Sequence, residues 1–117
     1  MKGKGSIMSI TVNIYYSGKN GAARKFAQEM TENGIVDAIR NEEGNQMYQY
    51  FFSMEDPETV LLIDRWENQE AIDRHHATKM MQTIIELREK YDLHMKVERF
   101  LSEEGQIPNQ DREFIRK

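Results

Sequence analysis

Residues 46–66 read QMYQYFFSMEDPETVLLIDRW, two apolar runs separated by a short polar turn. The first run is rich in aromatic residues and the second in branched aliphatic residues, and both compositions favour strands. Pro57 lies within the EDPET turn, where the fixed backbone of proline suits a chain reversal. Because a connection this short joins neighbouring antiparallel strands, the segment predicts a β-hairpin.

Two further strands are predicted, one near each end of the chain. Residues 9–16, SITVNIYY, place Ile10, Val12 and Ile14 on one face and small or polar side chains on the other. Residues 93–101, LHMKVERFL, alternate in the same way. These segments flank the hairpin, so a four-stranded sheet is expected.

Helical patterns fill the two intervals between these strands. Apolar residues recur at helical spacing from about residue 21 to residue 39, with an expected break at Asn33-Gly34. Asn20 is the expected N-cap of this helix. A second helical pattern, capped by Asn68, runs to about Tyr91 and is expected to restart at Thr78.

The predicted order is therefore β-α-β-β-α-β, an α+β fold of the ferredoxin-like type, in which both helices cover one face of an antiparallel four-stranded sheet. The strands carry large residues on both faces, so a second sheet is expected to cover the free face. A symmetric homodimer would supply that sheet. We expect a flexible tail at residues 1–7, the domain at 8–101, and a C-terminal tail at 102–117 that docks on the partner through Phe114 and Ile115.

Composition excludes several classes of protein. The chain has 117 residues, no cysteine and a net charge of −4, so disulfides and thiolate metal sites are excluded. The longest purely apolar run, residues 60–63, is far too short to span a membrane. Basic residues do not cluster as nucleic-acid binding requires. We expect a cytoplasmic protein that binds neither membrane nor nucleic acid.

The end of the hairpin holds the only tryptophan, Trp66, and the segment after it holds two of the three histidines. On a helical wheel His75 lies on the apolar face with Ile72, and His76 lies at its edge. Adjacent helical residues cannot bind one metal ion together, because that arrangement needs a spacing of four residues. Asp64 shares a strand face with Trp66, and an acid there is costly unless it is paired or functional. Periodicity alone favours a hydrogen-bonded core histidine, with Trp66 as packing, over a catalytic base.

The run LLIDRWENQEAIDRHHAT, residues 61–78, resembles the characteristic segment of the antibiotic biosynthesis monooxygenase family, whose members are dimeric α+β barrels. The matching positions are Asp64, Trp66 and His75. The Glu43-Gly44 turn before the second strand is also similar to the family. Two positions depart from it, because the family's second histidine and the cysteine after the Glu-Gly turn are absent. The haem-degrading branch resembles this chain at Asn13, but it needs a second tryptophan and a histidine further along the second helix, where this chain has Ile84, Leu87 and Arg88.

The resemblance implies oxygenation of a small, electron-rich phenol or quinol by molecular oxygen, without flavin, haem or metal. His75 would be the base, since an imidazole titrates at about pH 6.5. Asp64 would orient it or stabilise the imidazolium, and Trp66 Nε1 and Asn13 are candidate donors to the developing peroxide. The expected apolar wall of the substrate site comprises Tyr50, Met30, Met80 and Met81.

Two other functions fit the same residues. One is an isomerase on this scaffold, in which His75 moves protons within a small substrate. The other is a dimeric ligand-binding or stress-associated module without turnover, because a fold does not fix a function. Oxygen uptake distinguishes the first hypothesis from the isomerase, and release of an unchanged ligand would favour the binding module.

Overall fold

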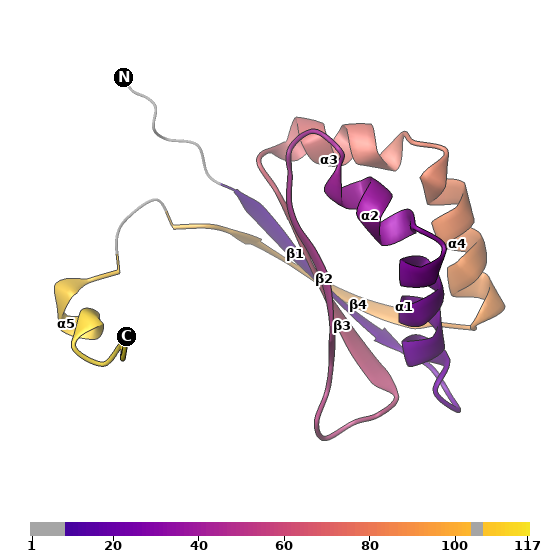
Figure 1. Ribbon diagram of the computed structural model, residues 1–117, viewed down its shortest axis with the longest axis horizontal. Helices are drawn as coiled ribbons and strands as arrows, with labels where there is room; N and C mark the ends of the chain where they lie inside the picture. The colour runs from indigo at the N-terminus through magenta and orange to yellow at the C-terminus, as the bar shows by residue number, and fades with distance from the viewer. Residues whose placement is uncertain (1–8, 104–106) are drawn as a thin grey trace.

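The computed structural model describes residues 9–103 and 107–117 (Figure 1). The predicted N-terminal tail, residues 1–7, lies outside the described residues. The elements in chain order are β1 (Ile10–Ser17), α1 (Ala22–Glu32), α2 (Ile35–Arg40), β2 (Asn45–Phe52), β3 (Thr59–Trp66), α3 (Gln69–His76), α4 (Met80–Lys90), β4 (His94–Leu101) and α5 (Asn109–Arg112).

The strands form one antiparallel sheet in the order β2-β3-β1-β4. At its centre, Ile14 of β1 pairs with Leu62 of β3 and with Val97 of β4. Side chains opposite one another in this register share a face of the sheet. The order and pairing confirm the predicted ferredoxin-like α+β fold, with the hairpin formed by β2 and β3.

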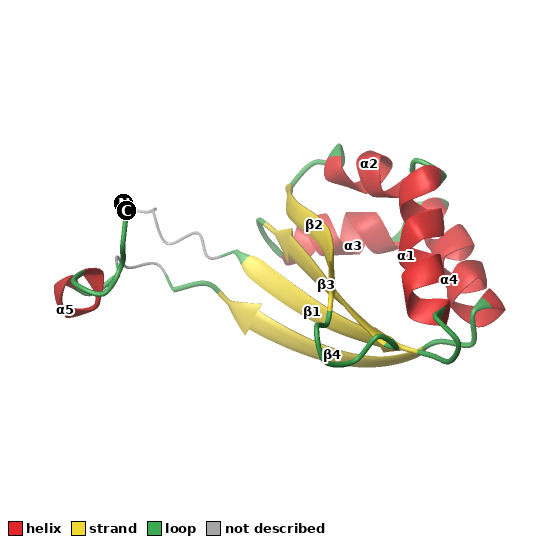
Figure 2. Ribbon diagram, turned by 60° about the horizontal axis from the view of Figure 1, so that its bottom comes forward, coloured by secondary structure: helices red, strands yellow, loops and turns green. Residues whose placement is uncertain are grey.

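Helices α1–α4 all lie on one side of the sheet, as Figure 2 shows. Each predicted helical region is divided in two, as expected from the sequence. Gly34, at φ 78°, separates α1 from α2. Residues 77–79 separate α3 from α4. Asn33-Gly34 and Thr78 therefore mark real breaks in the helices.

The predicted cap of the first helix is wrong. Gly21 is the N-cap residue and makes no side-chain cap, while Asn20 has a left-handed backbone at φ 56°. The Glu58 carboxylate accepts the backbone N–H groups of Asn20 and Gly21 at 3.1 and 2.8 Å. Glu58 reaches them from the β2–β3 turn, a long-range contact that no local pattern indicates. The carboxylate still fits a helix N-terminus, where the helix dipole favours negative charge.

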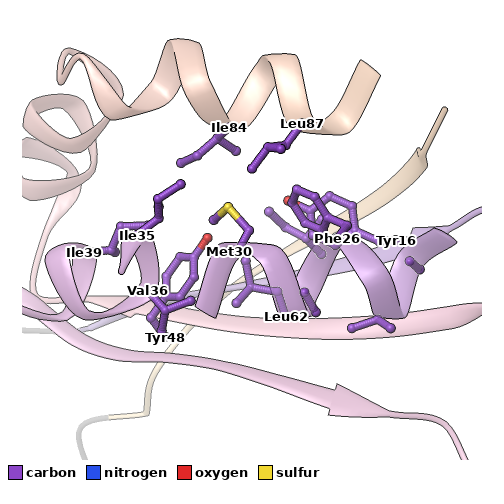
Figure 3. Packing of buried hydrophobic residues seen from close by; sticks show 14 of the residues in the cluster. Tyr16, Phe26, Met30, Ile35, Val36, Ile39, Tyr48, Leu62, Ile84 and Leu87 are labelled. Atoms are coloured by element: carbon purple, nitrogen blue, oxygen red, sulfur yellow. The ribbon is translucent and has the colours of Figure 1, made fainter. Parts of the chain in front are cut away.

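The core lies between the sheet and the helices (Figure 3). Phe26 and Met30 of α1 and Ile39 of α2 are fully buried. The Phe26 ring packs on Tyr16 of β1, with their centroids 4.9 Å apart. A large aromatic cluster of this kind contributes much of the hydrophobic stabilisation of a small domain.

The opposite face of the sheet carries no helix (Figure 2). Phe51 and Phe100 are exposed there, and Leu61 and Ile63 are half-buried. Figure 1 shows α5 beyond the end of β4, away from the other helices. Phe114 and Ile115, in the same C-terminal segment, are also exposed.

Candidate functional site

A cavity of about 340 Å³ lies among α3, α4 and strands β1, β3 and β4. We call it the α3–α4 cavity. Its wall combines apolar side chains with two arginines, two histidines and one carboxyl group. The lining residues are Val12, Ile14, Asp64, Trp66, Gln69, Ile72, His75, His76, Met81, Arg88, Met95, Val97 and Arg99.

Strand β3 supplies Asp64 and Trp66. Its side chains alternate strictly, with every second residue from Val60 to Trp66 buried against the helices. Trp66 and Asp64 are therefore brought to one face by the period of a strand. The indole Nε1–H of Trp66 donates to Asp64 Oδ1, so this N–H group is already occupied within the protein.

Helix α3 supplies His75. Asn68 caps the helix by accepting the Ala71 N–H at 2.9 Å, and the inward positions are Ala71, Ile72 and His75. The His75 ring lies against Trp66, with centroids 4.8 Å apart and an interplanar angle of 32°. At 5% exposure the imidazole is part of the interior, yet it borders the cavity.

Glu42 orients the His75 ring. Its Oε2 lies 2.8 Å from His75 Nδ1, and both side chains are mostly buried. Because a carboxylate is only an acceptor, Nδ1 carries the hydrogen and Nε2 keeps its lone pair. No described residue makes a hydrogen bond with Nε2. A carboxylate on one nitrogen and a free second nitrogen is the arrangement that prepares an imidazole to act as a base.

The turn that contains Glu42 is fixed by Gly44. This residue has φ 88°, and its carbonyl accepts the Glu67 N–H at 2.8 Å. A Cβ at this position would lie 2.6 Å from the Ala71 Cβ. Glycine thus allows the turn to approach the start of α3, which brings Glu42 within reach of His75.

Burial raises the pKa of the Asp64 carboxyl to about 7. The hydrogen bond from Trp66 lowers it, and the nearby charge of Glu42 raises it further. Asp64 therefore changes protonation near neutral pH, the range in which acid–base groups of enzymes operate. Its carboxyl group bonds to Trp66, while Glu42 takes the orienting position that the sequence suggested for Asp64.

His76 also lines the cavity, although it is the more exposed histidine. Burial lowers the pKa of His76, and the adjacent His75 lowers it further. The two rings are 5.6 Å apart. Both histidines thus reach the cavity, but His75 is the one held by a carboxylate and stacked on Trp66.

The predicted substrate-binding residues are dispersed. Met30 is fully buried in the core, and Tyr50 borders a separate groove formed by α1 and β2. Met80 packs against the core, while its neighbour Met81 lines the cavity. Asn13 lies on the helix-free face of the sheet, opposite to the cavity, since it alternates with Val12 and Ile14.

Sequence reasoning missed Glu42 and Arg88. Arg88 reaches from α4 to the cavity wall and donates to the Tyr16 hydroxyl from Nε at 3.2 Å and Nη2 at 3.0 Å. A signal existed, because Arg88 lies one helical turn after the buried Ile84 and so shares its face. Glu42 gave no such signal, because its contact with His75 spans 33 positions.

Within residues 9–103 and 107–117, no group of three or more histidine or acidic side chains forms a metal site. None of the helices described is long and apolar enough to cross a membrane. What the cavity does contain is an oriented imidazole, a carboxyl group that titrates near neutrality, and an apolar surface. These groups suit proton transfer to or from a small, largely apolar ligand.

The chain belongs to the antibiotic biosynthesis monooxygenase family, whose model matches residues 9–87. This range covers β1 to α4 and includes Glu42, Asp64, Trp66 and His75. The family supports a general monooxygenase-like role. No curated protein matches the sequence.

Solved structures share the fold at low sequence identity. A Deinococcus radiodurans protein, provisionally named an antibiotic biosynthesis monooxygenase, is 21% identical at a TM-score of 0.70, with 86% of this chain and 96% of that chain covered. A Bacteroides thetaiotaomicron protein of unknown function is 20% identical at a TM-score of 0.72, covering 83% and 100%. A conserved Methanosarcina mazei protein is 20% identical at a TM-score of 0.68, covering 82% and 94%.

Proposed function

We propose that the protein is a cofactor-independent monooxygenase that oxidises a small, electron-rich phenol or quinol with molecular oxygen. The observation that carries this proposal is the arrangement of His75 in the α3–α4 cavity. Glu42 holds its Nδ1 at 2.8 Å, Trp66 supports the ring face, and Nε2 is left as the base. The cavity places this base beside an apolar surface that fits an aromatic ring.

The reaction is balanced without an external reductant. His75 removes the proton of a substrate hydroxyl, and the resulting anion transfers one electron to oxygen. The substrate radical and superoxide then form a carbon–oxygen bond, and the peroxide accepts a proton from the imidazolium. Loss of water gives the product, so a quinol and oxygen yield a hydroxyquinone and water. One oxygen atom enters the product and the other enters water.

Each part of the site has a stated task in this proposal. Glu42 stabilises the imidazolium that forms when His75 takes the proton, as a buried carboxylate does beside a catalytic histidine. The apolar wall excludes water from the substrate anion and so favours electron transfer over reprotonation. Asp64, with its pKa near 7, is the second proton donor or acceptor available in the wall.

The test measures oxygen consumption with 1,4-dihydroxynaphthalene, with the non-enzymatic rate subtracted. The His75→Ala variant should lose about 100-fold or more in turnover, as expected when a general base is removed. The matched His76→Ala variant removes the adjacent imidazole and should change turnover little, because His76 has no orienting carboxylate. Labelled oxygen should place one atom in the product.

Three outcomes would contradict the proposal. A folded His75→Ala protein with full activity would exclude the base. Conversion of a substrate without oxygen uptake would favour the isomerase. Binding and release of an unchanged ligand would favour the non-catalytic module. Thermal denaturation must accompany each assay, because a lost hydrogen bond to buried Glu42 costs roughly 1–3 kcal/mol by itself.

We propose further that two copies pack through the helix-free sheet face and that the C-terminal segment docks on the partner. Exposed Phe51 and Phe100 on that face, and exposed Phe114 and Ile115 in the segment, support this assembly. Such an interface should bury more than about 1,000 Å². Sedimentation at micromolar concentration should give a dimer, and truncation after Leu101 should weaken it. A monodisperse monomer would exclude the dimer, and an unchanged dimer affinity would exclude the docking.

A further inference from the structure

Two guanidinium groups border the α3–α4 cavity outside any salt bridge. Arg88 and Arg99 both line it. Among the described residues, neither forms a salt bridge with a carboxylate within 4.0 Å. Arg99 Nη1 donates to the amide oxygen of Gln69 at 2.7 Å. Arg88 is half-buried and is attracted by the charge of Asp64, but with no carboxylate in contact it gains a direct ion pair when an anion binds.

Arg88 is held in place by a neutral group. Its Nε and Nη2 donate to the Tyr16 hydroxyl at 3.2 and 3.0 Å. Tyr16 is fully buried, and burial raises the pKa of its hydroxyl, so Tyr16 positions the guanidinium without neutralising it. The remaining N–H groups of Arg88 have no partner among the described residues. A planar fork of free N–H groups is the geometry that binds a carboxylate through two hydrogen bonds.

The charge of the cavity differs from that of the chain. The protein carries a net charge of −4, yet the wall has two arginines and a single acidic side chain, Asp64. The Asp64 carboxyl already accepts the Trp66 indole N–H. A cationic cavity in an acidic protein selects a negatively charged ligand and raises its local concentration.

We propose that Arg88 forms an anion subsite, and that the ligand of this cavity is an aromatic carboxylate. The inference rests on the proposed function and names its substrate class: a phenol or quinol that bears a carboxylate. His75 packs on Trp66, which pairs with the start of β1. Arg88 contacts Tyr16, which lies near the end of β1. The substrate hydroxyl therefore lies at His75 and the carboxylate at Arg88.

The volume of the cavity limits the size of the ligand. At about 340 Å³ it lies near the lower end of small-molecule sites, which span roughly 300–1,000 Å³. One or two fused rings with a carboxylate fit this space. Apolar Val12, Ile14 and Val97 form the floor beneath the ring.

The experiment measures binding by titration calorimetry, so it does not depend on turnover. The probes are 3-hydroxybenzoate and its neutral isostere 3-hydroxybenzamide, with inorganic phosphate as an anion that has no ring. The carboxylate should bind about tenfold or more tightly than the amide, as expected for charge-assisted hydrogen bonds to a guanidinium. Phosphate should bind more weakly than 3-hydroxybenzoate.

Variants locate the subsite. Arg88→Met keeps the length and apolar stem of the side chain and should abolish the preference for carboxylate. Arg88→Lys keeps the charge without the fork and should retain part of it. Arg74→Met removes the same charge from the exposed surface of α3 and should keep the full preference, since Arg74 does not line the cavity. If Arg88→Met fails to fold, the reduced carboxylate preference of Arg88→Lys provides the test.

Equal binding of the carboxylate and the amide would overturn the anion subsite. An unchanged preference in Arg88→Lys and Arg88→Met would also overturn it, and so would phosphate binding as tight as that of 3-hydroxybenzoate. None of these results bears on oxygen uptake with neutral quinols. A retained preference without oxygen uptake by any carboxylated quinol would instead refute the monooxygenase and leave the subsite intact.

Discussion

Two pairs of helices cover the same face of the sheet, α1 with α2 and α3 with α4. The two pairs have similar total lengths. The first pair packs closely, with Phe26, Met30 and Ile39 fully buried. The second pair lies over β3, β1 and the inner side of β4, where Val97 is 55% exposed, and it encloses the cavity. The α3–α4 cavity, with buried Asp64 and His75 in its wall, thus lies in the second half of the helical layer.

The largest expected effect tests the difference in packing. Phe26→Ala should destabilise the protein by about 3–5 kcal/mol, because it leaves a cavity against Tyr16 in the closely packed half. Met81→Ala, in the wall of the existing cavity, should cost about 1 kcal/mol, since Met81 is already half-buried beside open space. Chemical denaturation of both variants measures the contrast. Similar losses would mean that the two halves are packed alike.

Much of this contrast could be predicted from the sequence. Strict alternation in β3 placed Asp64 and Trp66 on one face, and helical spacing placed His75 inward. Both inferences depend on local periods that the fold preserves. Glu42 and the capping role of Glu58 could not be predicted, because each acts through contacts between segments distant in sequence. The placement of Met30 and Tyr50 also depends on which helix covers which strand, and no local pattern specifies that.

A second prediction concerns Asp64, the buried acid in the half of the domain that contains the α3–α4 cavity. Folding raises the pKa of Asp64 to about 7, so the folded protein binds a proton that the unfolded chain releases at about pH 4. Stability therefore falls as pH rises from about 4 to about 7, and the loss is complete above that range. Relative to Asp64→Asn, the wild type should lose about 2–3 kcal/mol between pH 5 and pH 8.

Denaturant titrations of wild type and Asp64→Asn at several pH values measure this difference. Asparagine is a suitable reference because its side-chain oxygen can still accept the Trp66 N–H and it does not titrate. If the stability difference between the two proteins is independent of pH, Asp64 has an ordinary pKa and burial does not raise it.

Two glycine substitutions test whether the close approach of the Gly44 turn to α3 holds the α3–α4 half of the domain in place. Gly44→Ala should destabilise the protein by about 2–3 kcal/mol, because alanine there is strained at φ 88° and its Cβ would meet Ala71 at 2.6 Å. Gly34→Ala, in the packed half, has a similar φ of 78° but no atom within 4 Å of the added Cβ. It should cost about 1 kcal/mol from backbone strain alone.

The glycine pair also has a functional readout. Displacement of the Gly44 turn should move Glu42 away from His75 and lower turnover beyond any loss of stability, whereas Gly34→Ala should leave turnover unchanged. Thermal denaturation and oxygen uptake on the same samples separate the two effects. Equal stability losses in the two variants would show that the approach of Gly44 to α3 is not tight.

The smallest expected effect concerns Tyr16, which contacts both halves of the domain. Its ring packs on Phe26 in the close-packed half, and its hydroxyl accepts two N–H groups from Arg88 in the α3–α4 half. Tyr16→Phe keeps the first contact and removes the second, so it should cost only about 1 kcal/mol, the value of a typical hydrogen bond. The freed guanidinium should lose its fixed orientation, and the preference for a carboxylate ligand should weaken without disappearing. Tyr15→Phe makes the same change one residue earlier on the opposite face of β1 and should alter neither property. If Tyr16→Phe leaves both stability and ligand preference unchanged, Tyr16 does not position Arg88, and the two halves are linked only by apolar packing.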